Sequence, residues 1–148
     1  MRIPVVIAAA LACGVAFQAE AADKKTPPAC SAVSFRPLAG AMNDGQATAG
    51  HYKSRFGSID LIGDVKAGQA AYAVRINNQP LKPLSGDIPK GSYSCLNSKH
   101  IKTPPQPVAG TCTGSRFRVA VDSSAKQKLV MLFALQGDDW KLCEAGTP

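Results

Sequence analysis

Four cysteines spread over most of the chain constrain its fold more than any other feature. They are Cys30, Cys95, Cys112 and Cys143, and a fifth, Cys13, lies in an apolar N-terminal segment. An even set of cysteines is typical of disulfide pairs in an exported protein. Their spacing disfavours zinc, because no two cysteines are separated by two residues and neither histidine lies near a cysteine pair at ligand spacing. The sequence therefore predicts two disulfides and no metal or other cofactor.

The pairing of these cysteines is left open by the sequence, since four cysteines can pair in three ways. We favour a local bridge, Cys95–Cys112, with Cys30–Cys143 joining the two ends of the chain. In the chain-entropy account, a bridge that closes a loop of roughly 17 residues stabilises the fold by ~3 kcal/mol.

The first 21 residues are typical of a cleavable signal peptide. Arg2 supplies a positive charge, an apolar run extends from Ile3 to Phe17, and Ala19-Glu20-Ala21 gives the small-x-small pattern that signal peptidase recognises. The apolar run is shorter than the ~20 residues needed to span a bilayer. We therefore expect cleavage before Ala22 and a periplasmic or secreted protein.

A lipoprotein signal is the alternative for the same segment. Ala10-Leu11-Ala12-Cys13 resembles a lipoprotein cleavage site, which would place a lipid anchor on Cys13. The leucine stands one position too close to the cysteine for the usual pattern, and the apolar run continues past it. These two departures favour ordinary cleavage and leave the lipid anchor as the minority alternative.

The chain after the signal peptide reads as a flexible leader, residues 22–29, followed by a single β-rich domain, residues 30–148. The clearest strand signal is a hairpin from Ser58 to Ile76, whose side chains alternate on both sides of a turn at Lys66-Ala67-Gly68-Gln69. The segment Cys30–Leu38 also alternates and predicts a first short strand.

The C-terminal part predicts three further strands in a meander. They are Arg116–Val121, Leu129–Leu135 and Trp140–Cys143. The middle segment is apolar throughout, too short for a helix and bounded by polar turns, so it predicts a central strand that is covered on both faces.

Together these patterns predict a mainly β (α+β) fold, an antiparallel meander sheet of five or six strands stapled by two disulfides. One short helix packed on the sheet, a sandwich or a small barrel would give the central strand its cover. Residues 41–56 fit a helix and a strand equally well. Residues 77–114 are irregular and rich in proline and glycine, which is typical of a functional loop on a rigid scaffold.

Charge supplies the main functional clue. The chain has 17 Lys and Arg against 10 Asp and Glu, a formal net charge of +7, and loss of the signal peptide removes one residue of each sign. A basic surface attracts anionic partners. Strand alternation places Arg116 and Arg118 on one face, opposite Phe117, and arginine suits phosphate or carboxylate. The candidate binding residues are Lys90, Tyr93, Lys99, His100, Lys102, Arg116 and Arg118.

These features favour a non-enzymatic binding or interaction module of the cell envelope or extracellular space. We expect an envelope or extracellular protein partner; an anionic polymer or lipid surface is the alternative, and an aromatic content of 6% disfavours nucleic acid. No catalytic residue is assigned, because no recognisable catalytic motif is present.

Two rival functions stay open, a secreted enzyme inhibitor and a small secreted hydrolase acting on envelope or extracellular polymer. A hydrolase would need His51 or His100 beside a nucleophile or carboxylate in a concave site.

Overall fold

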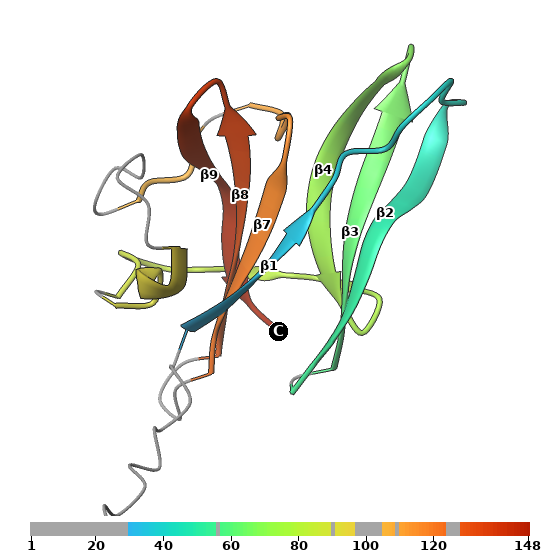
Figure 1. The fold of residues 1–148 in the computed structure, drawn as a ribbon. Helices are drawn as coiled ribbons and strands as arrows, with labels where there is room; N and C mark the ends of the chain where they lie inside the picture. The colour runs from blue at the N-terminus through green and yellow to red at the C-terminus, as the bar shows by residue number, and fades with distance from the viewer. Residues whose placement is uncertain (1–29, 56, 90, 97–104, 109, 124–127) are drawn as a thin grey trace, which may run out of the picture.

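A computed structural model describes residues 30–55, 57–89, 91–96, 105–108, 110–123 and 128–148. The signal peptide, the leader and four candidate binding residues, Lys90, Lys99, His100 and Lys102, lie outside these ranges. The described chain forms two antiparallel β-sheets that pack face to face (Figure 1). The predicted fold class, mainly β with antiparallel strands and two disulfides, is confirmed.

The two sheets divide the strands unequally. The five-stranded sheet has the spatial order β1 (Cys30–Phe35), β7 (Phe117–Asp122), β8 (Leu129–Gln136), β9 (Asp139–Thr147) and β6 (Lys82–Pro83). The four-stranded sheet has the order β2 (Gly45–Ser54), β3 (Gly57–Lys66), β4 (Gln69–Ile76) and β5 (Gln79–Pro80). The predicted strands from 116 to 143 do form a meander, but the first strand joins them beside β7, which the sequence did not indicate.

Local turn chemistry shapes the β3–β4 hairpin as expected. Its two-residue turn, Ala67-Gly68, has positive φ at both positions, 51° and 77°, as a type I′ turn requires. Residues 41–56, whose sequence fits a helix and a strand equally well, contain strand β2. Among the described residues, the only helical element is a short 3₁₀ turn, η1 (Ser94–Leu96), so the expected cover of the sheet is not an α-helix.

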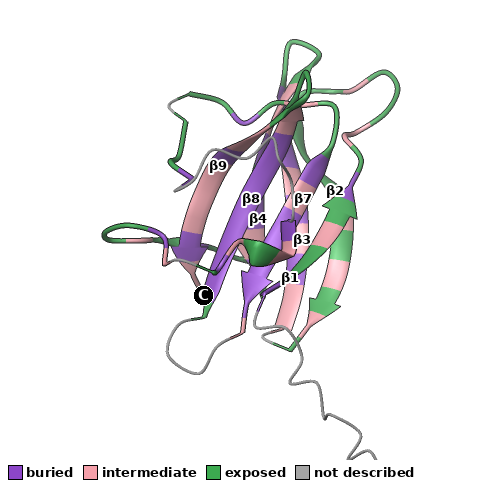
Figure 2. Ribbon diagram, turned by 60° about the vertical axis from the view of Figure 1, so that its left-hand side comes forward, coloured by how far each residue is buried: buried purple, intermediate pink, exposed green. Residues whose placement is uncertain are grey.

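The first apolar core lies between the two sheets. Inward-facing side chains of β3 and β4 meet those of β7 and β8, and Figure 2 shows the strongest burial along these central strands. Glycine at position 50 permits a close approach here, since a Cβ atom at that position would overlap the ring of Phe35. The buried residues of this first core are Phe35, Ile59, Leu61, Tyr72, Val74, Ile76, Leu81, Cys112, Phe117, Val119, Val121, Val130, Leu132 and Ala134.

A second apolar layer covers the other face of the five-stranded sheet. Leu129, Met131 and Phe133 of β8 point away from the four-stranded sheet and are fully buried. They contact Ile88 and Leu96 of a cover segment, which we define as residues 84–89 and 91–96. The prediction that β8 is covered on both faces is therefore confirmed. The irregular region supplies this cover, so part of it is structural.

A buried polar contact holds the cover segment on the sheet. The Ser92 hydroxyl donates a hydrogen bond to the carboxylate of Asp122 at 2.6 Å, and both residues are buried. Buried polar groups of this kind are costly when unpaired. The pair therefore fixes the cover segment at the end of β7.

The disulfides join Cys30 to Cys95 and Cys112 to Cys143, so the predicted pairing was wrong. The reason is the sidedness of the five-stranded sheet. Cys95 packs in the second apolar layer, whereas Cys112 belongs to the core between the sheets. Cys95 and Cys112 therefore lie on opposite faces of the five-stranded sheet and cannot bond to each other. Each bonds to the cysteine on its own face, Cys95 to Cys30 and Cys112 to Cys143.

Part of the outer edge of β4 is closed by groups from the loop before β7 and from β9. The Tyr72 N–H donates to the Cys112 carbonyl at 3.0 Å, and the Val74 N–H donates to the Glu144 carboxylate at 3.1 Å. A bulge in β9 lets Glu144 reach Val74. Leu132 of β8 pairs with Glu144, whereas the next residue, Phe133, pairs with Leu142, so Cys143 is left as an extra residue in β9. The extra residue, Cys143, consequently lies on the inter-sheet side together with Glu144.

Glu144 makes the stability of the fold dependent on pH. Burial raises the pKa of its carboxyl, and the hydrogen bond from Val74 opposes that rise. Because the folded-state pKa is raised, the stabilising contribution of this group is present at acid pH and is lost as pH rises through that pKa. Glu144→Gln should therefore become progressively more stable relative to the parent protein as pH rises above the ordinary carboxyl value of about 4 and through the raised pKa of Glu144.

Urea unfolding of both proteins across this range measures the effect. Asp138→Asn, at an exposed carboxylate in the β8–β9 turn, controls for the loss of one negative charge. Parallel stability profiles for the parent protein and Glu144→Gln would contradict the assignment.

Candidate binding face

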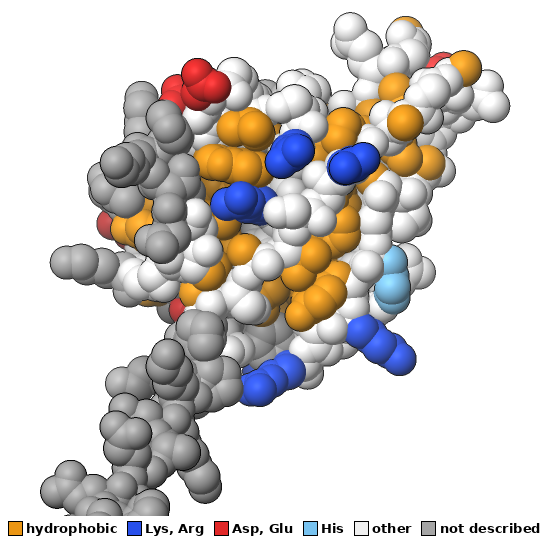
Figure 3. All heavy atoms as spheres, in the orientation of Figure 1, with side chains coloured by type: hydrophobic (Ala, Val, Ile, Leu, Met, Phe, Trp, Pro, Cys, Tyr) orange, Lys and Arg blue, Asp and Glu red, His pale blue; other side chains and the backbone are white. Residues whose placement is uncertain are grey.

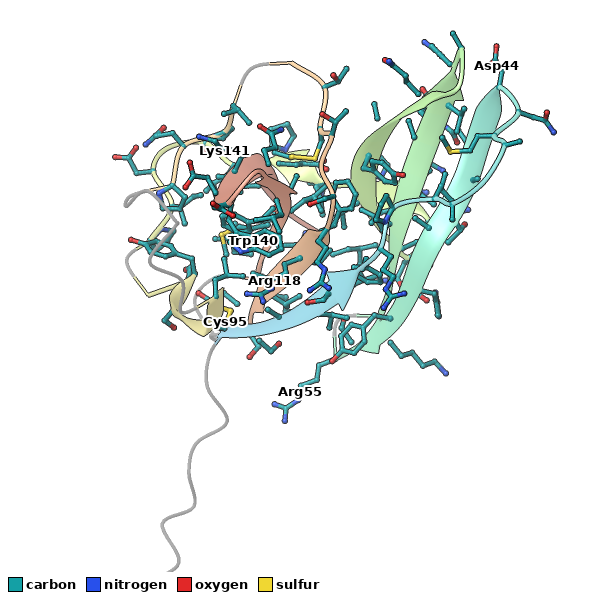
Figure 4. The ribbon with its side chains drawn as sticks, turned by 45° about the horizontal axis from the view of Figure 1, so that its top comes forward. Asp44, Arg55, Cys95, Arg118, Trp140 and Lys141 are labelled. Carbon is teal, nitrogen blue, oxygen red and sulfur yellow. A yellow bond between two sulfur atoms is a disulfide. The ribbon has the colours of Figure 1, made fainter. Side chains whose placement is uncertain are left out.

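Arg118 is the candidate binding residue whose side-chain contacts are best defined. On β7 it points away from Phe117, Val119 and the inter-sheet core, as strand alternation predicted. Its guanidinium carbon lies 4.7 Å from the centroid of the Trp140 ring, and its Nη1 donates to the Leu96 carbonyl at 3.4 Å. Figure 4 shows Arg118 extending toward Trp140 beside the cover segment. Such a cation–π contact is worth ~0.5–1 kcal/mol at a partly exposed site and fixes the side chain.

Arg36 and Arg116 extend the same face. The β1–β7 ladder pairs Ser34 with Arg118 and Phe35 with Phe117. Continuing this register by one residue places Arg36 opposite Arg116, on the face that Arg118 occupies. Both side chains are exposed. We refer to Arg36, Arg116 and Arg118 as the arginine cluster.

The arginine cluster lacks an acidic partner within the described ranges. Within these ranges the side chains of Arg36 and Arg116 take part in no hydrogen bond or ion pair, and the one hydrogen bond of the Arg118 side chain is to a backbone carbonyl. β1 and β7 lie on the side of the molecule that faces the viewer in Figures 1 and 3, where basic side chains stand close together among apolar ones. Like charges on adjacent strands destabilise a sheet, so an anion bound here would relieve a cost that the free protein bears.

The other candidate binding residues contribute less to this face. Tyr93 is half-buried and packs against the second apolar layer. It therefore supports the cover segment beneath Arg118 and does not extend the exposed cluster. The other four candidates lie outside the described ranges, so their role in binding stays a prediction from the sequence: Lys90, Lys99, His100 and Lys102.

Sequence reasoning missed Arg36 and the part played by Trp140. The alternation of Cys30–Leu38 places Arg36 on one face with Ser34, but joining that face to Arg118 requires the β1–β7 pairing. Trp140 is half-buried against the second apolar layer and forms the surface on which Arg118 stacks. No local pattern in the sequence carries either of these facts.

His51 has the neighbours that a hydrolase would need, but not their geometry. Its Nδ1 lies 2.5 Å from the Asp60 carboxylate on the outer face of the four-stranded sheet. The Ser58 hydroxyl lies 3.4 Å from Nδ1 and 3.3 Å from Nε2. An oxygen almost equidistant from both ring nitrogens is not aligned with the Nε2 lone pair, as a serine nucleophile must be. The His51 side chain is also 56% exposed.

A separate cleft of about 300 Å³ opens between the β3–β4 hairpin and the loop before β7. Its lining combines alanines and threonines with charged and amide side chains, and no candidate binding residue contributes to it. The residues that line it are Asp64, Lys66, Gln69, Ala70, Ala71, Thr111 and Thr113.

No protein-family model matches this chain, and neither a curated protein nor a solved structure is significantly similar to it. Among the described residues, no helix is long and apolar enough to cross a membrane. The two disulfides are compatible with an oxidising periplasmic or extracellular location.

Proposed function

We propose that this protein is an exported, non-enzymatic binding domain that contacts an anionic group on an envelope or extracellular partner through its arginine cluster. The signal-peptide pattern of the first 21 residues and the two disulfides support export. The basic net charge of +7 supports an anionic partner.

The observation that carries the proposal is the convergence of Arg36, Arg116 and Arg118 on one face of the five-stranded sheet, where the edge strand β1 ends beside the start of β7. Forked guanidinium donors bind phosphate or carboxylate in two-point contacts. Trp140 and the Leu96 carbonyl hold Arg118 in place, so little side-chain freedom would be lost when that arginine binds. The exposed Arg36 and Arg116 complete a cationic surface at the ends of two neighbouring strands, and such a surface suits an extended partner.

Replacing Arg36 and Arg116 together by glutamine tests the proposal. The double variant should bind a phosphate-bearing matrix roughly tenfold more weakly than the parent protein, because charge-assisted hydrogen bonds are lost at two positions. It should also elute at lower salt, since exposed charge interactions are screened.

Lys66→Gln with Lys82→Gln is the matched control. This pair removes the same two charges from exposed positions in the β3–β4 turn region and in β6. It should shift elution less than the arginine pair. Equal shifts for the two pairs would show that overall charge, and no particular face, governs binding, and the proposal would fail.

A further inference from the structure

Strand β2 has an uncovered edge along most of its length. It pairs with β3 on one side, and the described part of the chain places no strand on the other. The opposite edge of the same sheet differs, because Cys112 and Glu144 accept the outward N–H groups of Tyr72 and Val74 on β4. Figure 2 shows that β2 is mainly exposed or half-buried. A long edge of unpaired backbone groups is a template for a further strand.

We propose that β2 pairs in antiparallel fashion with β2 of a second copy of this chain, so that two four-stranded sheets join into one continuous sheet. Two-fold symmetry makes such a contact self-complementary and closed. The proposal concerns the opposite sheet from the arginine cluster and does not depend on the proposed function.

The bulge in β2 defines the register. On the outer face of the sheet, Gln46 pairs with Asp64 before the bulge, and Lys53 pairs with Ser58 after it. The register shifts between Thr48 and Gly50, so outward-facing side chains have even numbers before the bulge and odd numbers after it. A two-fold axis between positions 49 and 50 therefore matches outward side chains with outward ones, Gln46 with Lys53 of the second copy and Thr48 with His51.

The same register brings opposite charges together. Continued one residue beyond each end of β2, it places Asp44 of one copy opposite Arg55 of the other, and symmetry repeats the contact at the far end of the strand pair. Both side chains are exposed, and Figure 4 shows Asp44 and Arg55 near opposite ends of β2. One oxygen of the Asp44 carboxylate accepts a hydrogen bond from the Ala67 N–H in the β3–β4 turn at 2.9 Å, so the contact with Arg55 of the second copy uses the other oxygen. A parallel arrangement would instead place like charges at each end.

The first part of the edge also lacks the residues that usually prevent pairing. From Gly45 to Gly50 the strand contains no charged side chain and no proline, the two devices most often used to protect an edge. The bulge itself lies at the proposed two-fold axis, where it determines which side chains of β2 point to the outer face of the sheet.

Sedimentation of the disulfide-bonded protein beginning at Ala22, over a range of concentrations, tests the proposal. The parent protein should form a dimer. Asp44→Arg alone and Arg55→Asp alone each create like-charge contacts at both ends of the strand pair and should weaken dimerisation roughly tenfold. An equimolar mixture of these two variants should dimerise as the parent does, because in the mixed dimer both contacts are attractive again.

Asp138→Arg and Lys82→Asp are matched controls, which make the same charge changes on the other sheet. They should dimerise like the parent protein. A parent protein that stays monomeric, single variants that dimerise normally, or a mixture that fails to recover would each overturn the proposal. The mixture also guards against a folding artefact at Asp44, since a damaged hairpin would not be rescued by Arg55→Asp.

Discussion

Replacing Cys30 and Cys95 by serine is expected to lower the free energy of unfolding by about 4 kcal/mol, because this bridge closes a long loop in the unfolded chain. The two cysteines are 65 residues apart in sequence, and the bridge ties the start of β1 to the cover segment. Domains of this size are stable by only about 5–15 kcal/mol. The variant should therefore lose a large share of its stability.

The Cys30–Cys95 variant should also change where the protein opens. Without the bridge, the cover segment is held on the sheet mainly by Ser92 and by apolar contacts, so its release would expose Met131 and Phe133. Binding of a fluorescent apolar dye should rise at denaturant concentrations below the main unfolding transition.

The second disulfide provides the comparison. Cys112 and Cys143 are 31 residues apart, and their replacement by serine should cost about 3.5 kcal/mol in the same account. That variant leaves the cover segment bridged, so the early rise in dye binding should be absent. An identical early rise in both variants, or a peptide map of the parent protein that joins Cys95 to Cys112, would contradict the assigned pairing.

Phe133→Ala is expected to cost about 3–5 kcal/mol, the range found when a large buried aromatic side chain is truncated. Phe133 has no solvent-exposed surface and lies on the side of β8 that faces the cover segment. The loss of unfolding free energy measures how tightly the irregular cover segment packs on this face of β8, where other folds place a helix or a second sheet. Chemical denaturation followed by tryptophan fluorescence, with Trp140 as the reporter, gives the value.

Val108→Ala serves as the control, because Val108 is a large apolar residue that is 41% exposed. Its truncation should change stability by less than about 0.5 kcal/mol. A cost below about 1 kcal/mol for Phe133→Ala would mean that the second apolar layer is loosely packed.

Strands whose patterns depend on their own neighbours could be predicted from the sequence. The β3–β4 hairpin follows from alternation and a positive-φ turn. The double burial of β8 follows from an apolar run with polar turns at both ends. The shared direction of Arg116 and Arg118 needs only the period of a strand.

The features that were missed depend on contacts between distant segments. The pairing of β1 with β7 joins residues more than 80 positions apart, and both the division into two sheets and the position of Arg36 depend on it. The disulfide pairing depends on which face of a sheet each cysteine occupies. Residues 41–56 were ambiguous because the bulge between Thr48 and Gly50 breaks the alternation of β2, so that Ala49 and Tyr52 fall at helical spacing.

The position of Cys30 also has a mechanical consequence. Cys30 begins β1 and is bonded to Cys95 on the cover segment. Tension applied to the chain on the N-terminal side of Cys30 would reach this covalent bond before it reached the β1–β7 hydrogen bonds. The strand could not be peeled from the sheet one residue at a time from that end while the bond is intact. Reduction would convert a covalently locked attachment point into one that yields by unzipping, and a pulling experiment on oxidised and reduced protein would register the difference as a drop in rupture force.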